Sequence, residues 1–150
     1  MEIRRAVVGD VAELARLLWR HAAPEEQAAQ SVEKFRVDLA AWWEAHMHSH
    51  LAFVATNDGV HLVGMAWLAL LPRIPRPGRS TRQSADIQSV FVMPEHRGAG
   101  IGSALVEAAT AHAFATGAGR VTVSSSRRAV PVYQRSGFSA SPQLLERSAD

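Results

Sequence analysis

The chain has 150 residues, the usual size of one domain, with 47% hydrophobic and 20% charged residues. This composition is typical of a globular protein, so we expect one domain over residues 1–150 with a core of its own. The lack of cysteine excludes a disulfide framework, a thiolate metal site and a cysteine nucleophile. A formal net charge of only +2 is weak support for a nucleic-acid partner, and a cofactor or substrate bearing phosphates would explain the same small arginine excess.

The sequence carries no signal for export or membrane insertion. Residues 1–5 are charged and lack the apolar stretch of a signal peptide. The longest apolar run, Leu62 to Leu71, is far shorter than the roughly 20 residues that span a bilayer. The absence of cysteine fits a reducing compartment. We therefore expect a cytoplasmic protein with no membrane partner.

The first half of the chain predicts a strand, two helices and a hairpin. Asp10 precedes a run with apolar residues on one face, and aspartate is a favoured helix cap. Asn57-Asp58-Gly59 is a hairpin signal between two apolar runs. The expected elements are a strand at 3–7, a helix from Asp10 that ends before Pro24, a helix from about 25 or 31 to about 46, and strands at 51–56 and 60–71.

The second half predicts alternating strands and helices. Residues 72–84, rich in arginine, proline and glycine, are expected to form a long irregular loop. Then follow a strand at 85–93, a turn at 94–99, a helix at 100–116, a strand at 120–124, a short helix at 127–136 capped by Gly137, and a strand from Phe138 with which 144–147 pairs. The order predicts a mixed α/β (α+β) domain around one sheet of six to seven strands, flanked by about four helices.

A strand, a glycine-rich turn and a helix follow one another over residues 90–103. Exposed N–H groups at a helix N-terminus carry partial positive charge and suit phosphate. Gly98, Gly100 and Gly102 allow a pyrophosphate to approach the backbone, and successive amides can form an anion-binding nest. Arg97 adds a full positive charge at the rim. The turn is therefore predicted to bind phosphate groups.

Two well-known phosphate motifs do not fit this turn. A P-loop needs a lysine before its serine or threonine, and Gly102-Ser103 has none. A dinucleotide fingerprint needs glycine where Ser103 stands and an acidic residue about 20 positions further on, at the end of the next strand. The sequence lacks both features.

A third pattern fits. Arg97–Gly102 resembles the signature Arg/Gln-x-x-Gly-x-Gly/Ala of the GNAT superfamily of acyl-CoA-dependent N-acyltransferases, which follows a strand ending in Val-x-Pro. Ala129–Phe138 is similar to that family's Ala-x-x-x-Tyr-x-x-x-Gly-Phe segment, and residues 3–14 resemble its start. The resemblance covers nearly the whole chain and is most specific over residues 85–138. It implies an acetyl-CoA-dependent N-acetyltransferase with a mixed, mostly antiparallel sheet.

The resemblance also implies where acetyl-CoA, the acyl donor, lies. Its pantetheine arm follows the central strand, and its pyrophosphate meets the amides of the glycine turn. Many relatives have asparagine where this chain has Ser126, so the contact there is altered. The residues assigned to the donor are Phe91, Val92, Arg97, Gly98, Ala99, Gly100, Ile101, Gly102, Ser103, Ser126 and Tyr133.

Two residues are candidates for proton transfer. The resemblance makes Tyr133, the chain's single tyrosine, the acid that reprotonates the departing thiolate; a packed aromatic is the alternative. Asp86 is the candidate base, because strand alternation places it on one face with Gln88, Val90 and Val92; a solvated aspartate is the alternative. Without a cysteine, transfer is expected to be direct, in a ternary complex.

Other features have simpler explanations. His46, His48 and His50 would share a strand face and invite a metal, but exposed histidines at a helix end are favoured, so no metal is expected. Trp42 and Trp43 cannot both face the core; one could line the acceptor pocket, which the resemblance places near the first two helices, but core or interface packing is favoured. A solvated loop is favoured over an anion site for the arginines that recur every third residue, Arg73, Arg76, Arg79 and Arg82.

Two alternatives to an enzyme stay open. A CoA-binding sensor or regulatory module would keep the glycine turn but need no acid at Tyr133. A nucleic-acid-binding domain using the arginine loop would show steep salt dependence, and the lack of a basic helix argues against it. The acceptor, a small-molecule amine or a peptide, is not determined by the sequence. A homodimer is expected from the family's habit alone.

Overall fold

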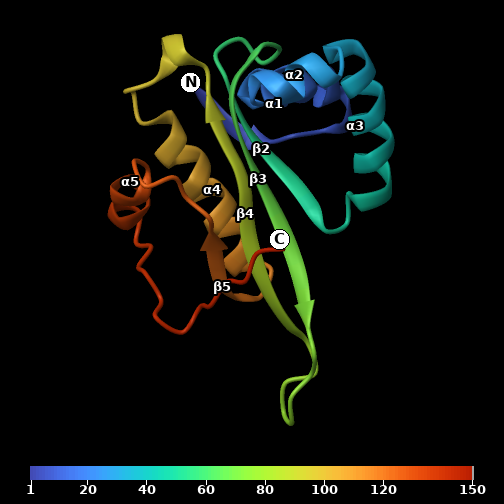
Figure 1. Ribbon diagram of the computed structural model, residues 1–150. Helices are drawn as coiled ribbons and strands as arrows, with labels where there is room; N and C mark the ends of the chain where they lie inside the picture. The colour runs from blue at the N-terminus through green and yellow to red at the C-terminus, as the bar shows by residue number, and fades with distance from the viewer. Residues whose placement is uncertain (150) are drawn as a thin grey trace.

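The computed structural model describes residues 1–149, which form a five-stranded sheet with helices on both faces (Figure 1). The strands are β1 (Glu2–Arg5), β2 (His50–Thr56), β3 (Leu62–Arg73), β4 (Arg82–Val92) and β5 (Ala118–Val123). The helices are α1 (Val11–His21), α2 (Pro24–Ala29), α3 (Val32–His46), α4 (Ile101–Ala115) and α5 (Val130–Arg135), with short 3₁₀ turns at Val8–Asp10 and Pro94–His96. Strands pair in chain order, antiparallel except for the parallel pair β4–β5. The predicted mixed, mostly antiparallel α/β domain is confirmed.

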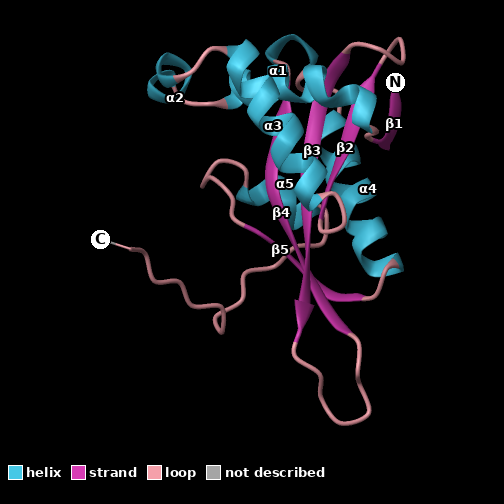
Figure 2. Ribbon diagram, turned by 90° about the vertical axis from the view of Figure 1, so that its right-hand side faces the viewer, coloured by secondary structure: helices cyan, strands magenta, loops and turns pink. Residues whose placement is uncertain are grey.

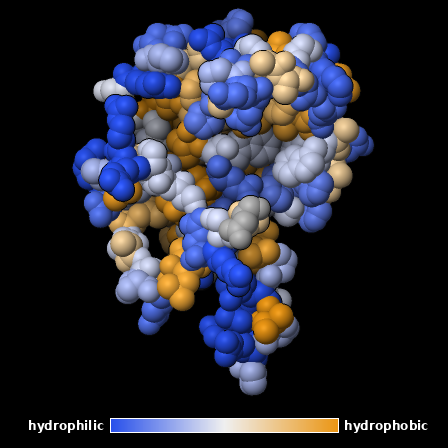
Figure 3. All heavy atoms as spheres, viewed as in Figure 1, coloured by the Kyte–Doolittle hydropathy of each residue, from blue (hydrophilic) through white to orange (hydrophobic). Residues whose placement is uncertain are grey.

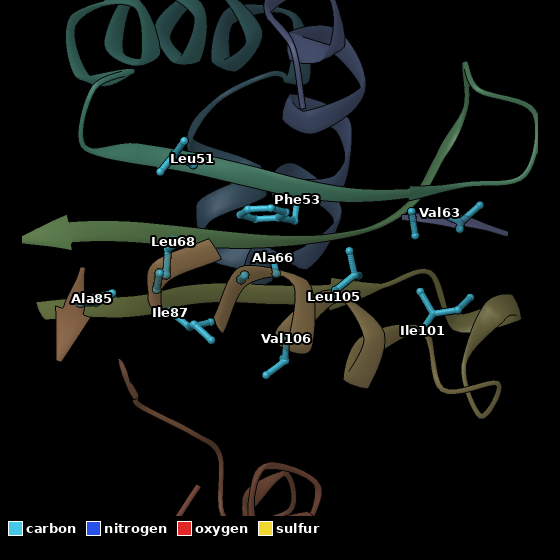
Figure 4. Packing of buried hydrophobic residues seen from close by; sticks show 14 residues of the cluster. Leu51, Phe53, Val63, Ala66, Leu68, Ala85, Ile87, Ile101, Leu105 and Val106 are labelled. Carbon is cyan, nitrogen blue, oxygen red and sulfur yellow. The ribbon is translucent and has the colours of Figure 1, made fainter. Parts of the chain in front are cut away.

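The sheet is buried on both faces. Helices α1 and α3 pack on one face and α4 on the other, and Figures 1 and 2 show these layers from two sides. Side chains of β2 alternate accordingly: Leu51 and Phe53 pack with α4, whereas Ala52 and Val54 pack with α1 and α3. Figure 4 shows α4 laid over the first set. Burial on two faces explains the unbroken apolar run of β3.

Helix α4 approaches the sheet closely at Gly64. A Cβ on this glycine would lie 3.0 Å from Leu105 Cδ1 and 3.3 Å from the Phe91 carbonyl oxygen. A side chain there would push the helix away from the strands, at the point where α4 begins beside the end of β4. Gly64 therefore fixes how deeply the glycine turn sits on the sheet.

Strand β4 carries a β-bulge at Gln88. Its neighbours Ile87 and Ser89 pair with consecutive residues of β3, so Gln88 has no partner of its own in that strand. An extra residue reverses the face on which the following side chains lie. Ile87 therefore packs on the α4 side before the bulge, and Val90 and Val92 pack on the same side after it.

The bulge makes one prediction wrong. Simple alternation placed Asp86, Gln88, Val90 and Val92 on one face. In the structure Val90 and Val92 pack with α4, whereas Asp86, next to the α4-facing Ile87, lies on the α1–α3 face. The two-residue period held only up to the inserted residue.

The predicted sheet of six to seven strands is also wrong, because residues 124–149 contain no strand. The segments at 138–140 and 144–147 flank a turn in which the Leu144 amide donates to the Ser141 carbonyl at 3.3 Å. Leu145 is 87% exposed, so this segment has no apolar face to bury against β5. The helices number five rather than about four, because residues 24–46 form α2 and α3.

The predicted loop at 72–84 is shorter than expected. Antiparallel pairing continues to Arg73 opposite Arg82, and the bridge between Arg76 and Arg79 closes the tip. Backbone pairing thus extends the hairpin past the core despite the local proline and arginine content. The hairpin projects from the body of the molecule in Figures 1 and 2.

One of the two helix starts predicted from the sequence has the expected side-chain cap, and the other does not. The Ser31 hydroxyl accepts the Lys34 amide and caps α3, as expected for one of its two predicted starts. Asp10 precedes α1 but does not cap it: its carboxylate accepts the Val7 amide at 2.7 Å and pairs with Arg4 at 2.8 Å. The Arg4 hydrogen bond lowers the pKa of Asp10. No helix within residues 1–149 is long and apolar enough to cross a membrane.

Candidate functional site

Strands β4 and β5 separate beyond Ile87. Their parallel pairing ends at Ile87 opposite Val123, so the β5-facing edge of Gln88–Val92 pairs with no strand of residues 1–149. The first helical turn of α4 stands above this opening (Figure 1). Hydrophobic atoms lie recessed near the centre of this face, between hydrophilic rims (Figure 3). An extended ligand that pairs with backbone could therefore lie along β4.

The glycine turn presents bare backbone to this opening. Gly98 and Gly100 have φ values of 83° and 81°, the left-handed region that glycine adopts without strain. No recorded hydrogen bond from the amides of residues 98–103 reaches an acceptor within residues 1–149; the first helical bond runs from Ala104 to Gly100. Unpartnered amides at a helix start are the donors that a phosphate group needs.

Arg97 does not extend freely from the rim. Its Nε donates to the Val92 carbonyl at 2.9 Å, and its guanidinium carbon lies 5.5 Å from the centre of the Phe91 ring. The side chain thus ties the turn back to the end of β4. It keeps a positive charge beside the amides while holding Phe91, which is buried on the α1–α3 side.

Tyr133 lies on the other side of the opening. It is half-buried on α5, packs edge-on against Phe138 with ring centres 5.6 Å apart, and contacts the α4-side core. Burial raises the pKa of its hydroxyl, so the proton is retained around neutral pH. Ser126 is exposed, and its hydroxyl accepts the Ala129 amide at 3.3 Å, where it supports the start of α5.

Asp86 faces away from Tyr133, toward the α1–α3 side. The Thr122 hydroxyl donates to Asp86 Oδ1 at 2.7 Å. Sheet register places His50, Ala69 and Asp86 in one row across β2, β3 and β4. The structure therefore does not bring the two predicted catalytic residues together on one face; the open part of β4 lies between them.

A small pocket of about 150 Å³ lies on the α1–α3 face beside the bulge. Trp67 lines it, and the Trp67 indole N–H is buried without an acceptor among the described residues. Trp42 is 41% exposed and lines the pocket, whereas Trp43 is buried, so the two tryptophans divide as expected. The lining residues are Leu18, Leu39, Trp42, His50, Trp67, Gln88 and Ser89.

This pocket was not found from the sequence. Its walls come from α1, α3, β2, β3 and β4, so its members are far apart in the chain. One signal was available: Trp67 carries a polar N–H inside an otherwise apolar run, and a buried indole N–H usually has a partner.

A larger cavity of about 780 Å³ lies elsewhere, between α4, β5, α5 and residues 138–144. None of residues 98–103 lines it, although Tyr133 does. It occupies the outer side of β5, where the predicted sixth and seventh strands would have stood. This cavity is therefore separate from the glycine turn.

His46, His48 and His50 and the arginine-rich hairpin at the tip of β3 and β4 lie apart from the glycine turn. His46 ends α3 and stacks on Trp42 with ring centres 4.5 Å apart. No group of three or more metal-ligating side chains within residues 1–149 is arranged to hold an ion. Arg82 donates to the Ile74 carbonyl at 2.8 Å on the hairpin, far along β4 from the glycine turn.

Comparison with known proteins agrees with this geometry. A curated relative, glucosamine 6-phosphate N-acetyltransferase of Trypanosoma brucei brucei, is 35% identical over 79 residues, which cover 53% of this chain and only 52% of the relative. A crystal structure of a T. brucei acetyltransferase superposes with a TM-score of 0.77 at 26% identity, covering 99% of both chains.

A third protein shares the fold alone. It is a predicted acetyltransferase of Clostridium acetobutylicum, solved with acetyl-CoA, with a TM-score of 0.75 at 17% identity over 98% of this chain and 95% of that one. The model of the acetyltransferase (GNAT) family matches residues 11–138, which include the glycine turn and the Tyr133 segment. With that match over most of its length, the chain belongs to the GNAT acetyltransferase family.

Proposed function

We propose that this protein transfers an acetyl group from acetyl-CoA to a primary amine, directly and in one domain over residues 1–150. The observation that carries the proposal is the row of unpartnered amides at residues 98–103 beside the open edge of β4. Acetyl-CoA is bound in the C. acetobutylicum structure of the same fold. The acceptor is a small-molecule amine or a peptide.

The residues of the turn fit the donor's phosphates. Gly98 and Gly100 have no Cβ to collide with a ligand, and their φ values aim successive amides outward. Arg97 adds positive charge, and Ser103 and Ile101 contribute amides of the first turn of α4. Val92 and Phe91 supply backbone for the pantetheine arm. Ala99, Gly102 and Ser126 complete the proposed contact set, in which Ser126 is the weakest because its hydroxyl is already engaged.

Acid–base roles follow from the two faces of β4. The thioester supplies an activated acyl carbon to the bound amine. Tyr133 keeps its proton because burial raises its pKa, so it is available to protonate the thiolate that leaves. Asp86 lies on the acceptor side, where it can attract an ammonium group and accept its proton, directly or through water. The amine nitrogen loses one proton and the sulfur gains one.

Calorimetric titration of acetyl-CoA into the purified protein tests the donor, and thiol release with a panel of amines tests turnover. We expect micromolar binding by the wild type and by Tyr133→Phe, which keeps the ring against Phe138. We expect kcat of the variant to fall about 100-fold, the usual size of a general-acid contribution. No binding at millimolar acetyl-CoA would overturn the proposal.

Other outcomes assign different roles. Tight binding with no turnover of any amine would favour a CoA-binding sensor or regulatory module. Full turnover by Tyr133→Phe would mean that the tyrosine only packs. The cytoplasmic location and the homodimer stay predictions. Sedimentation of the purified protein measures its oligomeric state and so tests the homodimer.

A further inference from the structure

The pocket of about 150 Å³ on the α1–α3 face lies beside the Gln88 bulge, on the side of β4 opposite Tyr133. We infer that this pocket binds the body of the acceptor amine, that Trp67 donates a hydrogen bond to it, and that His50 takes the proton of its ammonium group. The inference rests on the proposed function, because the pocket becomes an acceptor site only if β4 holds the donor.

Size and lining define the class of acceptor. A cavity of about 150 Å³ is large enough for a benzene-sized group. Leu18, Leu39 and the rings of Trp42 and Trp67 make apolar walls, and no arginine, lysine, aspartate or glutamate is among the lining residues. Burying a phosphate or sulfate there would leave its charge without a partner. The pocket therefore suits an amine with a short, uncharged, apolar body.

Trp67 supplies the one fixed donor. Its residue is 6% exposed, and its Nε1–H has no acceptor within residues 1–149. The ring is held in place by Trp43, which packs edge-on at 5.4 Å and donates its own N–H to the His50 carbonyl at 3.0 Å. The Nε1 atom has less than 1 Å² of accessible surface, so a ligand acceptor atom reaches it when the neighbouring side chains shift slightly. An unpaired N–H then gains a hydrogen bond.

His50 contacts the Ser49 hydroxyl through one of its ring nitrogens. The Ser49 hydroxyl donates to the His46 carbonyl at 3.3 Å and lies 2.8 Å from His50 Nδ1. With the hydroxyl hydrogen on the His46 carbonyl, Nδ1 is the donor of this pair and Nε2 keeps a free lone pair, which is the tautomer that the inference requires. When the ammonium N–H bond breaks, the proton forms an N–H bond at Nε2 and the positive charge moves to the imidazole.

The groups around His50 favour this role. Burial, followed by the neighbouring His46 and His48, lowers the pKa of His50, so the ring is neutral at pH 7 and able to accept a proton. Asp86 lies in the same row of the sheet, two strands away with Ala69 between, and is not among the groups that shift the pKa of His50. The pocket residues from α1 and β4, which are Leu18, Gln88 and Ser89, are not titratable.

A binding test separates the pocket from the chemistry. The probes are benzylamine and the three isomers of pyridylmethylamine, which match it in size and add one acceptor nitrogen. They are titrated into the ¹⁵N-labelled protein saturated with coenzyme A, and the Trp67 indole signal is assigned by its loss in Trp67→Phe. We expect the probes to shift this signal, and one pyridyl isomer to bind about fivefold tighter than benzylamine, the ratio that one net hydrogen bond supplies.

Trp67→Phe should abolish this preference and leave benzylamine affinity nearly unchanged, because the phenyl ring keeps an apolar wall. This double comparison isolates the indole hydrogen bond. If the Trp67 signal does not move with any probe, the inference is overturned. The same holds if glucosamine 6-phosphate binds more tightly than benzylamine and shifts the signal.

A pH profile tests His50. In the wild type, kcat with saturating benzylamine should fall as pH drops through a pKa below 6.5, because His50 becomes protonated and stops accepting a proton. His50→Gln should lower kcat by about 100-fold and lose this acid limb. His48→Gln, at a neighbouring histidine outside the pocket lining, should keep the rate and retain the limb, moved to higher pH because His48 no longer lowers the pKa of His50.

The two proposals fail in distinguishable ways. Calorimetry with acetyl-CoA reports on the donor side of the wild type without any amine, so loss of that binding overturns the proposed function first. If the protein binds acetyl-CoA and acetylates amines, but the pH profile of kcat of His50→Gln is identical to that of the wild type, the role of His50 is overturned. The acetyltransferase proposal then still stands.

Discussion

The proposed donor side and the proposed acceptor side of strand β4 are built from different parts of the chain, one from backbone and the other from side chains. The donor side is a continuous run, residues 98–103, and offers backbone amides that any sequence with the right glycines would present. The acceptor side is a pocket of side chains drawn from five separate elements. A backbone site tolerates change in its side chains but not in its backbone angles, and a side-chain pocket behaves in the opposite way.

The largest expected effect contrasts two adjacent residues on the acceptor side. Trp43→Ala should lower the free energy of unfolding by about 3–5 kcal/mol, because it empties a buried site and removes the indole bond to the His50 carbonyl. Trp42→Ala, at a residue that is 41% exposed, should lower it by less than about 1 kcal/mol. Urea denaturation measures both; equal losses would contradict the division of the two tryptophans.

On the donor side, Gly100→Glu should weaken acetyl-CoA binding by more than about 100-fold. The residue must keep a φ of 81°, and the new carboxylate would stand among the amides proposed for the pyrophosphate. The matched control is Gly78→Glu on the hairpin, which has a φ of 77° and equally open surroundings. Calorimetry should show normal binding by the control; comparable losses in both variants would place the donor elsewhere.

A subtler change should affect stability and binding in opposite directions. Ser103→Asp puts a negative charge in the first turn of α4, where the helix dipole favours it by about 0.3–1 kcal/mol. The same charge should repel the phosphates and weaken acetyl-CoA binding by about tenfold, or about 1.4 kcal/mol. Thermal unfolding and calorimetry on one sample test the pair. A variant that is more stable and binds normally would argue against phosphates at this turn.

The sequence predicted the fold where local signals dominate and failed where long-range pairing decides. The glycine turn, the helix after it and the central strands were placed correctly, because each depends on neighbouring residues. The bulge at Gln88 carries no sequence signal of its own, since it arises from how β4 fits β3. The expected strand at Phe138 failed because its expected partner, residues 144–147, offers no apolar face to bury: Leu144 and Leu145 are both exposed.

The same limit applies to the site. Most of the proposed donor residues lie in one stretch, residues 97–103, and could be identified by their pattern; their roles await the titrations above. The pocket around Trp67 needs the register of three strands and two helices before its members meet. Asp86 was predicted to share a face with Val90 and Val92. That prediction is wrong because the alternation of side chains along β4 was assumed to continue through the bulge at Gln88. The neighbours of Asp86 on the acceptor side, His50 and Ala69, follow from sheet register alone.

The bulge at Gln88 also makes chain length at this point matter more than residue identity. Replacing Gln88 by another polar residue keeps every later side chain of β4 on its present face. Deleting it would restore plain alternation, turn Val90 and Val92 toward α1 and α3, and expose Phe91 to the α4 side. A library that scans single-residue deletions should therefore find this position intolerant, whereas a substitution scan would pass over it.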